Sequence, residues 1–144
     1  MLRPEQWYKN ILIFIPLVFS RNLFNKEMFL TTTLGFFALC AISSANYIIN
    51  DIIDKKRDLT HPEKSKRAIA SGIVPTSIAL ILATIMYSLT LSFAYYFSKA
   101  FFGFLVAIIA ITTLYSLGLK NIIFLDNLLI SSNFVLRTLS GIFL

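Results

Sequence analysis

Acidic and amide side chains recur at four-residue intervals in the segment NDIIDKKRD, residues 50–58. If the helix before this segment continues for two more turns, Asn50, Asp54 and Asp58 lie on one face, with Asp51 alongside. Carboxylates at this spacing repel each other, so a cation should compensate them. Mg²⁺ prefers oxygen ligands and usually binds one or two carboxylates together with substrate phosphates. The segment therefore predicts a site for a divalent cation that carries phosphates; the alternative is a solvated loop in which the carboxylates pair with neighbouring basic residues.

The same helical face extends backward into apolar sequence. The four-residue spacing adds Asn46, and Ser43 follows three residues earlier. Polar groups inside a membrane are usually functional. This continuation favours a binding site over a merely solvated loop.

A basic segment follows the carboxylates. Residues 61–72, HPEKSKRAIASG, place Lys64, Lys66 and Arg67 within four positions and then continue with small residues. Such a loop can fold over an anionic group, with backbone N–H groups near Ser71 and Gly72 as further donors. The alternative is the excess of basic charge that cytoplasmic loops carry.

A second polar face lies near the C-terminal end of the chain. Asp126, Asn133 and Arg137 stand at positions i, i+7 and i+11, which a helix projects on one side within about 20°. Asp126 and Arg137 are about 16 Å apart along the axis, so they cannot pair with each other. Each therefore needs a partner on another helix or a ligand; for Asp126 the alternative is an interfacial position.

The composition requires these segments to be positioned by membrane-spanning helices. Of 144 residues, 57% are hydrophobic and 14% are charged, whereas a soluble domain has about 25% charged residues. A soluble globule of this size has too little interior for so much apolar surface, and disordered chains are poor in hydrophobic residues. Runs of roughly 20 apolar residues predict spanning helices. We expect an all-α, polytopic transmembrane bundle with a loop at 51–73 and five spans near residues 8–24, 28–50, 74–97, 100–119 and 121–144.

The basic residues predict the orientation of this bundle, because cytoplasmic loops carry an excess of Lys and Arg. Five spans place nine basic residues on the side of the N-terminus and the 51–73 loop, and three on the other side. We therefore expect an inner-membrane protein whose N-terminus and active-site loops are cytoplasmic. Nucleic acid is not an expected partner, since the charge forms no stripe on a soluble domain.

Five motifs in this order resemble the UbiA superfamily of intramembrane prenyltransferases. They begin with RPxQWxKN at residues 3–10 and the NDxxDxxxD segment, and end with Tyr115-x-x-x-Leu119-Lys120 and Arg137-x-x-x-Gly141. The opening motif and HPxK at residues 61–64 bring the chain nearest to the decaprenyl-phosphate phosphoribosyltransferase branch. The resemblance covers the whole chain but about the first half of a family member, and it implies five helices of a nine-helix fold. Ala68 stands where the family commonly has Pro, which should loosen the loop.

The resemblance implies a reaction and a set of site residues. A phosphoribosyl group would pass from phosphoribosyl pyrophosphate to a polyprenyl phosphate, a step of cell-envelope biosynthesis, and Mg²⁺ would neutralise the departing pyrophosphate. Asp51, Asp54 and Asp58 would hold the metal, with Asp51 and Asp54 as catalytic residues. The substrate-binding residues would be Lys9, Asn46, Asn50, Lys64, Arg67, Tyr115, Lys120 and Arg137.

Two other functions remain open at this point. One is an aromatic prenyltransferase of the same superfamily, which makes a quinone or haem precursor. The other is a membrane transporter or assembly subunit, in which Asp126 and Arg137 line a permeation route. The partners expected are the lipid bilayer and the two substrates, and homo-oligomerisation is left open. Because the chain stops at Leu144 inside a span, we expect a partial chain with little catalytic activity alone.

Overall fold

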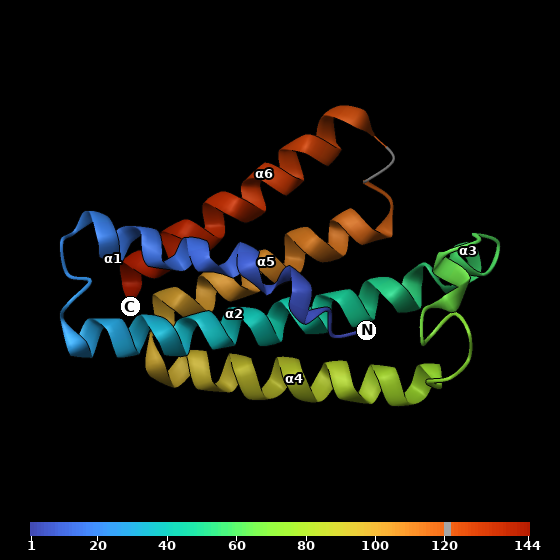
Figure 1. Cartoon of the computed structure of the whole chain (residues 1–144), viewed down its shortest axis with the longest axis horizontal. Coiled ribbons are helices and arrows are strands. Elements are labelled where there is room, and N and C mark those ends of the chain that lie inside the picture. The colour runs from blue at the N-terminus through green and yellow to red at the C-terminus, as the bar shows by residue number, and fades with distance from the viewer. Residues whose placement is uncertain (120–121) are drawn as a thin grey trace.

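The computed structural model describes residues 1–119 and 122–144, leaving out the side chain of Ile123 (Figure 1). In this part of the chain all regular secondary structure is helical, as predicted. The elements are the 3-10 helices η1, η2 and η4 and six α-helices. Their bounds are η1 Pro4–Phe14, α1 Ile15–Phe19, α2 Lys26–Ile53, α3 Lys55–Leu59, η2 Lys64–Lys66, α4 Thr76–Phe97, α5 Lys99–Leu117, α6 Ile123–Ser140 and η4 Gly141–Phe143.

Three helices, α2, α4 and α5, are long and apolar enough to cross a membrane. In α6 the apolar sequence is interrupted by Asp126, Asn133 and Arg137. These polar residues do not break the helix, because its backbone hydrogen bonds are made within the segment.

The segment predicted as the first span is built differently. Its eleven-residue helix η1 is a 3-10 helix, and the five residues of α1 follow directly. A 3-10 helix rises about 2.0 Å per residue against about 1.5 Å in an α-helix, so the two elements together reach about 30 Å. That is the thickness of a bilayer's hydrocarbon core, about 30 Å. The tighter winding thus makes this segment, which also contains the polar residues Glu5, Gln6 and Lys9, longer than an α-helix of the same number of residues.

The long helix α2 lies at the centre of the bundle, against η1, α4 and α5 (Figure 1). Its contact with α4 is made through alanines, and Ala45, Ala79 and Ala83 are fully buried. Small residues let helices in a membrane approach closely. Near the other end, Gly141 lies so close to η1 that an added Cβ would be 2.1 Å from the carbonyl oxygen of Ile13. The glycine of the Arg137-x-x-x-Gly141 motif thus allows η4 to pack against η1.

The second helix does not continue unbroken to Asp58, which was the condition for a single helical face that carries Asn50, Asp54 and Asp58. Helix α2 ends at Ile53, and Asp54 caps it before the short helix α3 begins. The carbonyl of Asp54 still accepts a hydrogen bond from the N–H of Asp58, at 2.8 Å. One helical turn is therefore kept across the break, and the four-residue spacing still places both carboxylates together.

The loop after α3 is held by local hydrogen bonds and by one buried side chain. The Nδ1 atom of His61 accepts hydrogen bonds from the backbone N–H groups of Glu63 and Lys64, at 3.2 and 3.3 Å. Ile69 is buried in the cluster that joins α2 and α4. The loop leaves this cluster through Gly72, whose φ of 82° is accessible to glycine without strain. These contacts hold the basic segment over the end of α2, at the right in Figure 1.

Candidate functional site

Two neighbouring cavities lie along the polar faces of α2 and α6, and Tyr115 of α5 lines both. The first, which we call the loop cavity, has a volume of about 300 Å³ and is lined by Asn50, Asp54, Arg57, Asp58, Lys64, Arg67, Tyr115 and Asp126. The second, which we call the inner cavity, has a volume of about 260 Å³ and is lined by Lys9, Ser43, Asn46, Tyr47, Thr112, Tyr115, Ile130, Asn133, Phe134 and Arg137.

The loop cavity combines acidic and basic side chains of α3, η2 and α6 with those of Asp54 and Arg67, which adjoin these helices. Three carboxylates line it, two from the region where α2 meets α3 and one, Asp126, from α6. The Oδ1 atom of Asp126 is buried and has no hydrogen-bond partner within the described residues. A buried carboxylate oxygen without a partner is costly. A cation in this cavity would compensate it.

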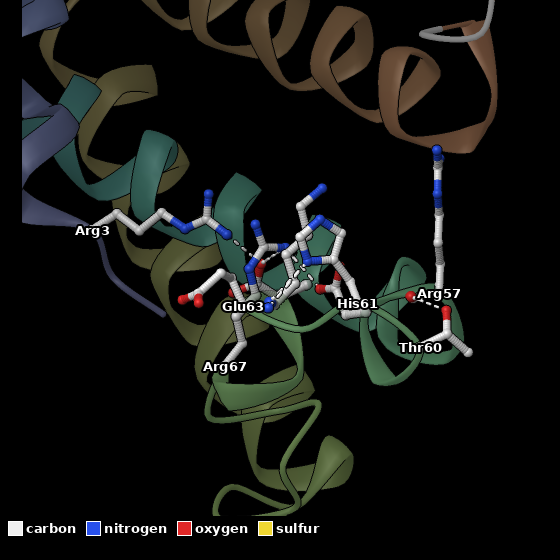
Figure 2. Close-up of polar contacts among 9 residues, drawn as sticks. Arg3, Arg57, Thr60, His61, Glu63 and Arg67 are labelled. Atoms are coloured by element: carbon white, nitrogen blue, oxygen red, sulfur yellow. Dashed lines mark hydrogen bonds and ion pairs between the residues drawn. The ribbon is translucent and has the colours of Figure 1, made fainter.

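Asp51 does not line either cavity. Its carboxylate is 2% exposed and is held between two guanidinium groups, those of Arg3 and Arg67, the second at 3.3 Å. Arg67 also binds Asp58, at 2.7 Å, so one side chain connects both carboxylates. Figure 2 shows Arg3 and Arg67 converging on this cluster, while Arg57 extends away from it. The structure therefore brings Asp54 and Asp58 to the loop cavity and places Asp51 in an ion-pair network behind it.

The donor set of the loop cavity fits Mg²⁺ only together with a phosphate ligand. Across residues 1–119 and 122–144, no three His, Cys, Asp or Glu side chains gather closely enough to hold a metal ion. Mg²⁺ keeps several waters and is usually bound by one or two carboxylates plus substrate phosphates. Asp54 and Asp58 can supply those carboxylates, and Lys64 and Arg67 line the same cavity as phosphate donors.

The inner cavity has basic but no acidic lining residues in the described structure. Its cations are Lys9 of η1 and Arg137 of α6, and the Nε atom of Arg137 is buried without a hydrogen-bond partner there. The hydroxyl of Tyr87 donates to Oδ1 of Asn46, at 2.6 Å, which leaves Nδ2 of Asn46 as a buried donor without a partner in the described residues. Donors and positive charge with no acid beside them favour an anionic ligand.

A model of the UbiA prenyltransferase family matches residues 11–144, nearly the whole chain, and includes every residue that lines the two cavities except Lys9. The chain belongs to the UbiA prenyltransferase family. With three helices that can cross a membrane, this UbiA-family chain is a multi-pass membrane protein.

Several curated proteins resemble the UbiA-family chain over 97% of its length. The decaprenyl-phosphate phosphoribosyltransferase of Corynebacterium glutamicum is 35% identical, and the chain covers 43% of it. The enzyme of the same name from Mycolicibacterium smegmatis is 31% identical, with 45% of it covered. An uncharacterized protein of Sinorhizobium fredii is 36% identical, with 27% covered. The chain thus spans less than half the length of these relatives.

The predicted substrate-binding residues of the UbiA-family chain divide between the two cavities. Asn50, Lys64 and Arg67 line the loop cavity, whereas Lys9, Asn46 and Arg137 line the inner cavity. Tyr115 lines both, and Lys120 lies outside the described residues. The sequence therefore pointed to both groups without separating them.

Other lining residues were not predicted as site residues. Thr112 stands one helical turn before Tyr115 in an apolar helix, a polar spacing that would have placed it on the same face. Its hydroxyl donates to Oδ1 of Asn133 at 3.4 Å and so connects α5 to α6. Asp126 and Asn133 belong to the predicted polar face of α6 but were not assigned a binding role. For Tyr47 the only signal is its position beside Asn46.

Proposed function

We propose that this chain carries substrate-binding parts of an intramembrane transferase that moves a phosphoribosyl group from phosphoribosyl pyrophosphate to a polyprenyl phosphate. The observation that carries the proposal is the pair of cavities that meet at Tyr115, one with mixed charge and one with positive charge alone. The Corynebacterium and Mycolicibacterium relatives are both named decaprenyl-phosphate phosphoribosyltransferase, which supports the same reaction.

The loop cavity suits the pyrophosphate of the donor. Mg²⁺ held by Asp54 and Asp58, with Asp126 opposite, would neutralise the leaving group. Lys64 and Arg67 would bind its oxygens through charge-assisted hydrogen bonds. Asn50 lines the same cavity and can orient a bound oxygen.

The inner cavity suits the phosphate of a lipid acceptor. Lys9, Arg137 and the unpaired amide of Asn46 would bind the phosphate, and the polyprenyl tail would lie between helices. An oxygen of this phosphate would attack C1 of the ribose while the bond from C1 to the pyrophosphate oxygen breaks. Because the attacking phosphate is already anionic, the reaction needs no strong general base.

An aromatic prenyltransferase remains the second candidate, since Tyr47 and Phe134 line the inner cavity and could stack on an aromatic acid. In that case the pyrophosphate in the loop cavity would belong to a prenyl donor.

Product analysis separates the two candidates. We would replace the matching segment of the Corynebacterium relative with this chain and supply membranes with labelled phosphoribosyl pyrophosphate and a polyprenyl phosphate, or with a prenyl diphosphate and an aromatic acid. A phosphoribosylated lipid that requires Mg²⁺ is expected. A prenylated aromatic product, or no product from a well-expressed protein, would contradict the proposal. The chain expressed alone serves as a comparison, and we expect little turnover from it.

The orientation of the site is part of the proposal. The N-terminus and the loop after α3 lie toward the same end of the bundle (Figure 1). A phosphatase or fluorescent-protein reporter fused within residues 61–67 should report a cytoplasmic location. A signal from the opposite side would contradict this orientation.

A further inference from the structure

Arg3 lines neither cavity, yet it contacts a residue behind the loop cavity and a residue in the wall of the inner cavity. Its guanidinium donates to the carboxylate of Asp51 and lies 4.8 Å from the centroid of the Tyr47 ring. Asp51 is bound to Arg67, which lines the loop cavity, whereas Tyr47 itself lines the inner cavity. One side chain from the N-terminal segment therefore reaches the walls of both sites.

The backbone around Arg3 is fixed by Ser44 of α2. The Ser44 hydroxyl donates to the carbonyl of Leu2, at 2.9 Å, and accepts a hydrogen bond from the indole N–H of Trp7, at 3.1 Å. Ser44 is fully buried. Arg3 is thus held at a defined position at the start of η1, with a φ of 48° that a non-glycine residue rarely adopts.

On the side of the loop cavity, Arg3 acts through a shared carboxylate. Oδ1 of Asp51 accepts from both Arg3 and Arg67, and the same Nη1 atom of Arg67 binds Asp58 at 2.7 Å. Asp51 and Asp58 are each 2% exposed, so neither can turn to water for a replacement partner. Without Arg3, the uncompensated charge of Asp51 would draw Arg67 toward itself and away from Asp58 and the cavity.

On the side of the inner cavity, Arg3 acts through the ring of Tyr47. A guanidinium over an aromatic face is attracted by the ring's quadrupole, so this contact favours the orientation in which the ring faces Arg3. Because Tyr47 forms part of the cavity wall, its orientation sets the shape of the space beside Lys9 and Arg137.

We propose that Arg3 is a positioning residue that sets both sites at once, Arg67 through Asp51 and the inner cavity through Tyr47. The inference rests on the proposed function, because it takes the two cavities to be the two anion sites. Arg3 itself touches no ligand. Its loss should weaken binding in both cavities, whereas loss of Asp51 or of the Tyr47 ring should weaken binding in one.

The test measures the affinity of the purified chain, in detergent micelles, for two probes. Pyrophosphate with Mg²⁺ probes the loop cavity, and farnesyl phosphate probes the inner cavity. Arg3→Gln should weaken both affinities by about five-fold or more, because five-fold is the lower end of the couplings measured between two sites. Asp51→Asn should weaken only pyrophosphate, and Tyr47→Leu only farnesyl phosphate. Arg3→Gln combined with Asp51→Asn should bind pyrophosphate no worse than Asp51→Asn alone, because both changes act through one path.

Controls separate positioning from folding. Lys56→Gln removes a positive charge from an exposed residue that lines neither cavity, and both affinities should stay unchanged. Trp7 is the single tryptophan of the chain, so its unchanged emission in Arg3→Gln shows that η1 still packs on Ser44. If Arg3→Gln alters this emission, Arg3→Lys keeps the charge near Asp51 and should recover part of the pyrophosphate affinity.

The outcomes separate a failure of the proposed function from a failure of the positioning role of Arg3. A wild-type chain that binds neither probe overturns the proposed function and the inference with it. Normal wild-type binding that Arg3→Gln leaves unchanged, or weakens at one cavity alone, overturns the inference and leaves the proposed function standing.

Discussion

The loop cavity and the inner cavity differ in how their charges are compensated. In the first, the protein supplies a counter-ion for part of the acidic charge: Arg67 binds Asp58, which lines the cavity, and Asp51 behind it. In the second, Arg137 forms no ion pair among the described residues, and no acidic residue described there lines the cavity. A metal–phosphate complex that enters the loop cavity can form ion pairs equivalent to those that it displaces. In the inner cavity, by contrast, the guanidinium of Arg137 gains an ion-pair partner only when a ligand binds. This difference indicates that ligand affinity in the inner cavity depends more strongly on the ligand's negative charge than ligand affinity in the loop cavity does.

The largest expected effect is on the chemistry of the loop cavity. Asp54→Asn in the chimera with the Corynebacterium relative should lower turnover by orders of magnitude, because metal-assisted stabilisation of a leaving group is worth several kcal/mol. Initial rates at saturating donor measure it. Glu63→Gln, at an exposed residue outside both cavities, is the matched loss of a carboxylate and should leave the rate unchanged. Near-normal turnover of Asp54→Asn would show that this residue holds no metal.

The next effect tests the unpaired cation of the inner cavity. Arg137→Leu should weaken farnesyl phosphate binding about ten-fold or more, since hydrogen bonds to charged groups contribute about 1.5–3 kcal/mol. Thermal stability should be unchanged or raised, because the substitution removes a partly buried charge that has no ion-pair partner in the described structure. Pyrophosphate binding should remain. A large fall in melting temperature would mean that Arg137 is structurally paired, and the contrast between the cavities would fail.

A smaller effect is expected at Asp126, which lines the loop cavity together with Asp54 and Asp58. Asp126→Asn should weaken pyrophosphate binding with Mg²⁺ by about ten-fold, because the buried Oδ1 atom is a ready oxygen for the cation or its waters. Binding of pyrophosphate without Mg²⁺ should change little or improve. Titrations with and without Mg²⁺ measure the two pyrophosphate affinities. If Asp126→Asn weakens both affinities equally, the role of Asp126 is unrelated to the cation.

The smallest effect is the response to salt. Raising ionic strength from 0.1 to 1 M shortens the Debye length from about 10 to about 3 Å and screens accessible charges most. Pyrophosphate affinity should fall several-fold, since Lys64 and Arg57 in the loop cavity are exposed. Farnesyl phosphate affinity should fall less than about two-fold, because Arg137 and Lys9 in the inner cavity are only partly exposed, whereas Lys64 and Arg57 are exposed. An equal response at both cavities would remove the distinction in solvent access.

The class of the molecule, a bundle of membrane helices, and the polar faces of its helices α2 and α6 could be predicted from the sequence. Its apolar composition requires membrane helices, and helical periodicity places Asn46 and Asn50 on the side of α2 that faces the cavities. The rise of a helix separates Asp126 from Arg137, and the structure places them in different cavities. These properties follow from local geometry, which a sequence pattern records directly.

The tertiary structure alone decided which of the neighbouring aspartates faces a cavity. Asp51 follows Asn50 directly, yet its partner is Arg3, which lies 48 residues away in the sequence. Helical periodicity likewise did not predict three other features. These are the break at Asp54, the 3-10 winding of η1 and the separation of the cations into two cavities. Each depends on how helices distant in sequence pack together. Periodicity specifies the face of one helix, whereas packing between helices selects the partner that this face meets.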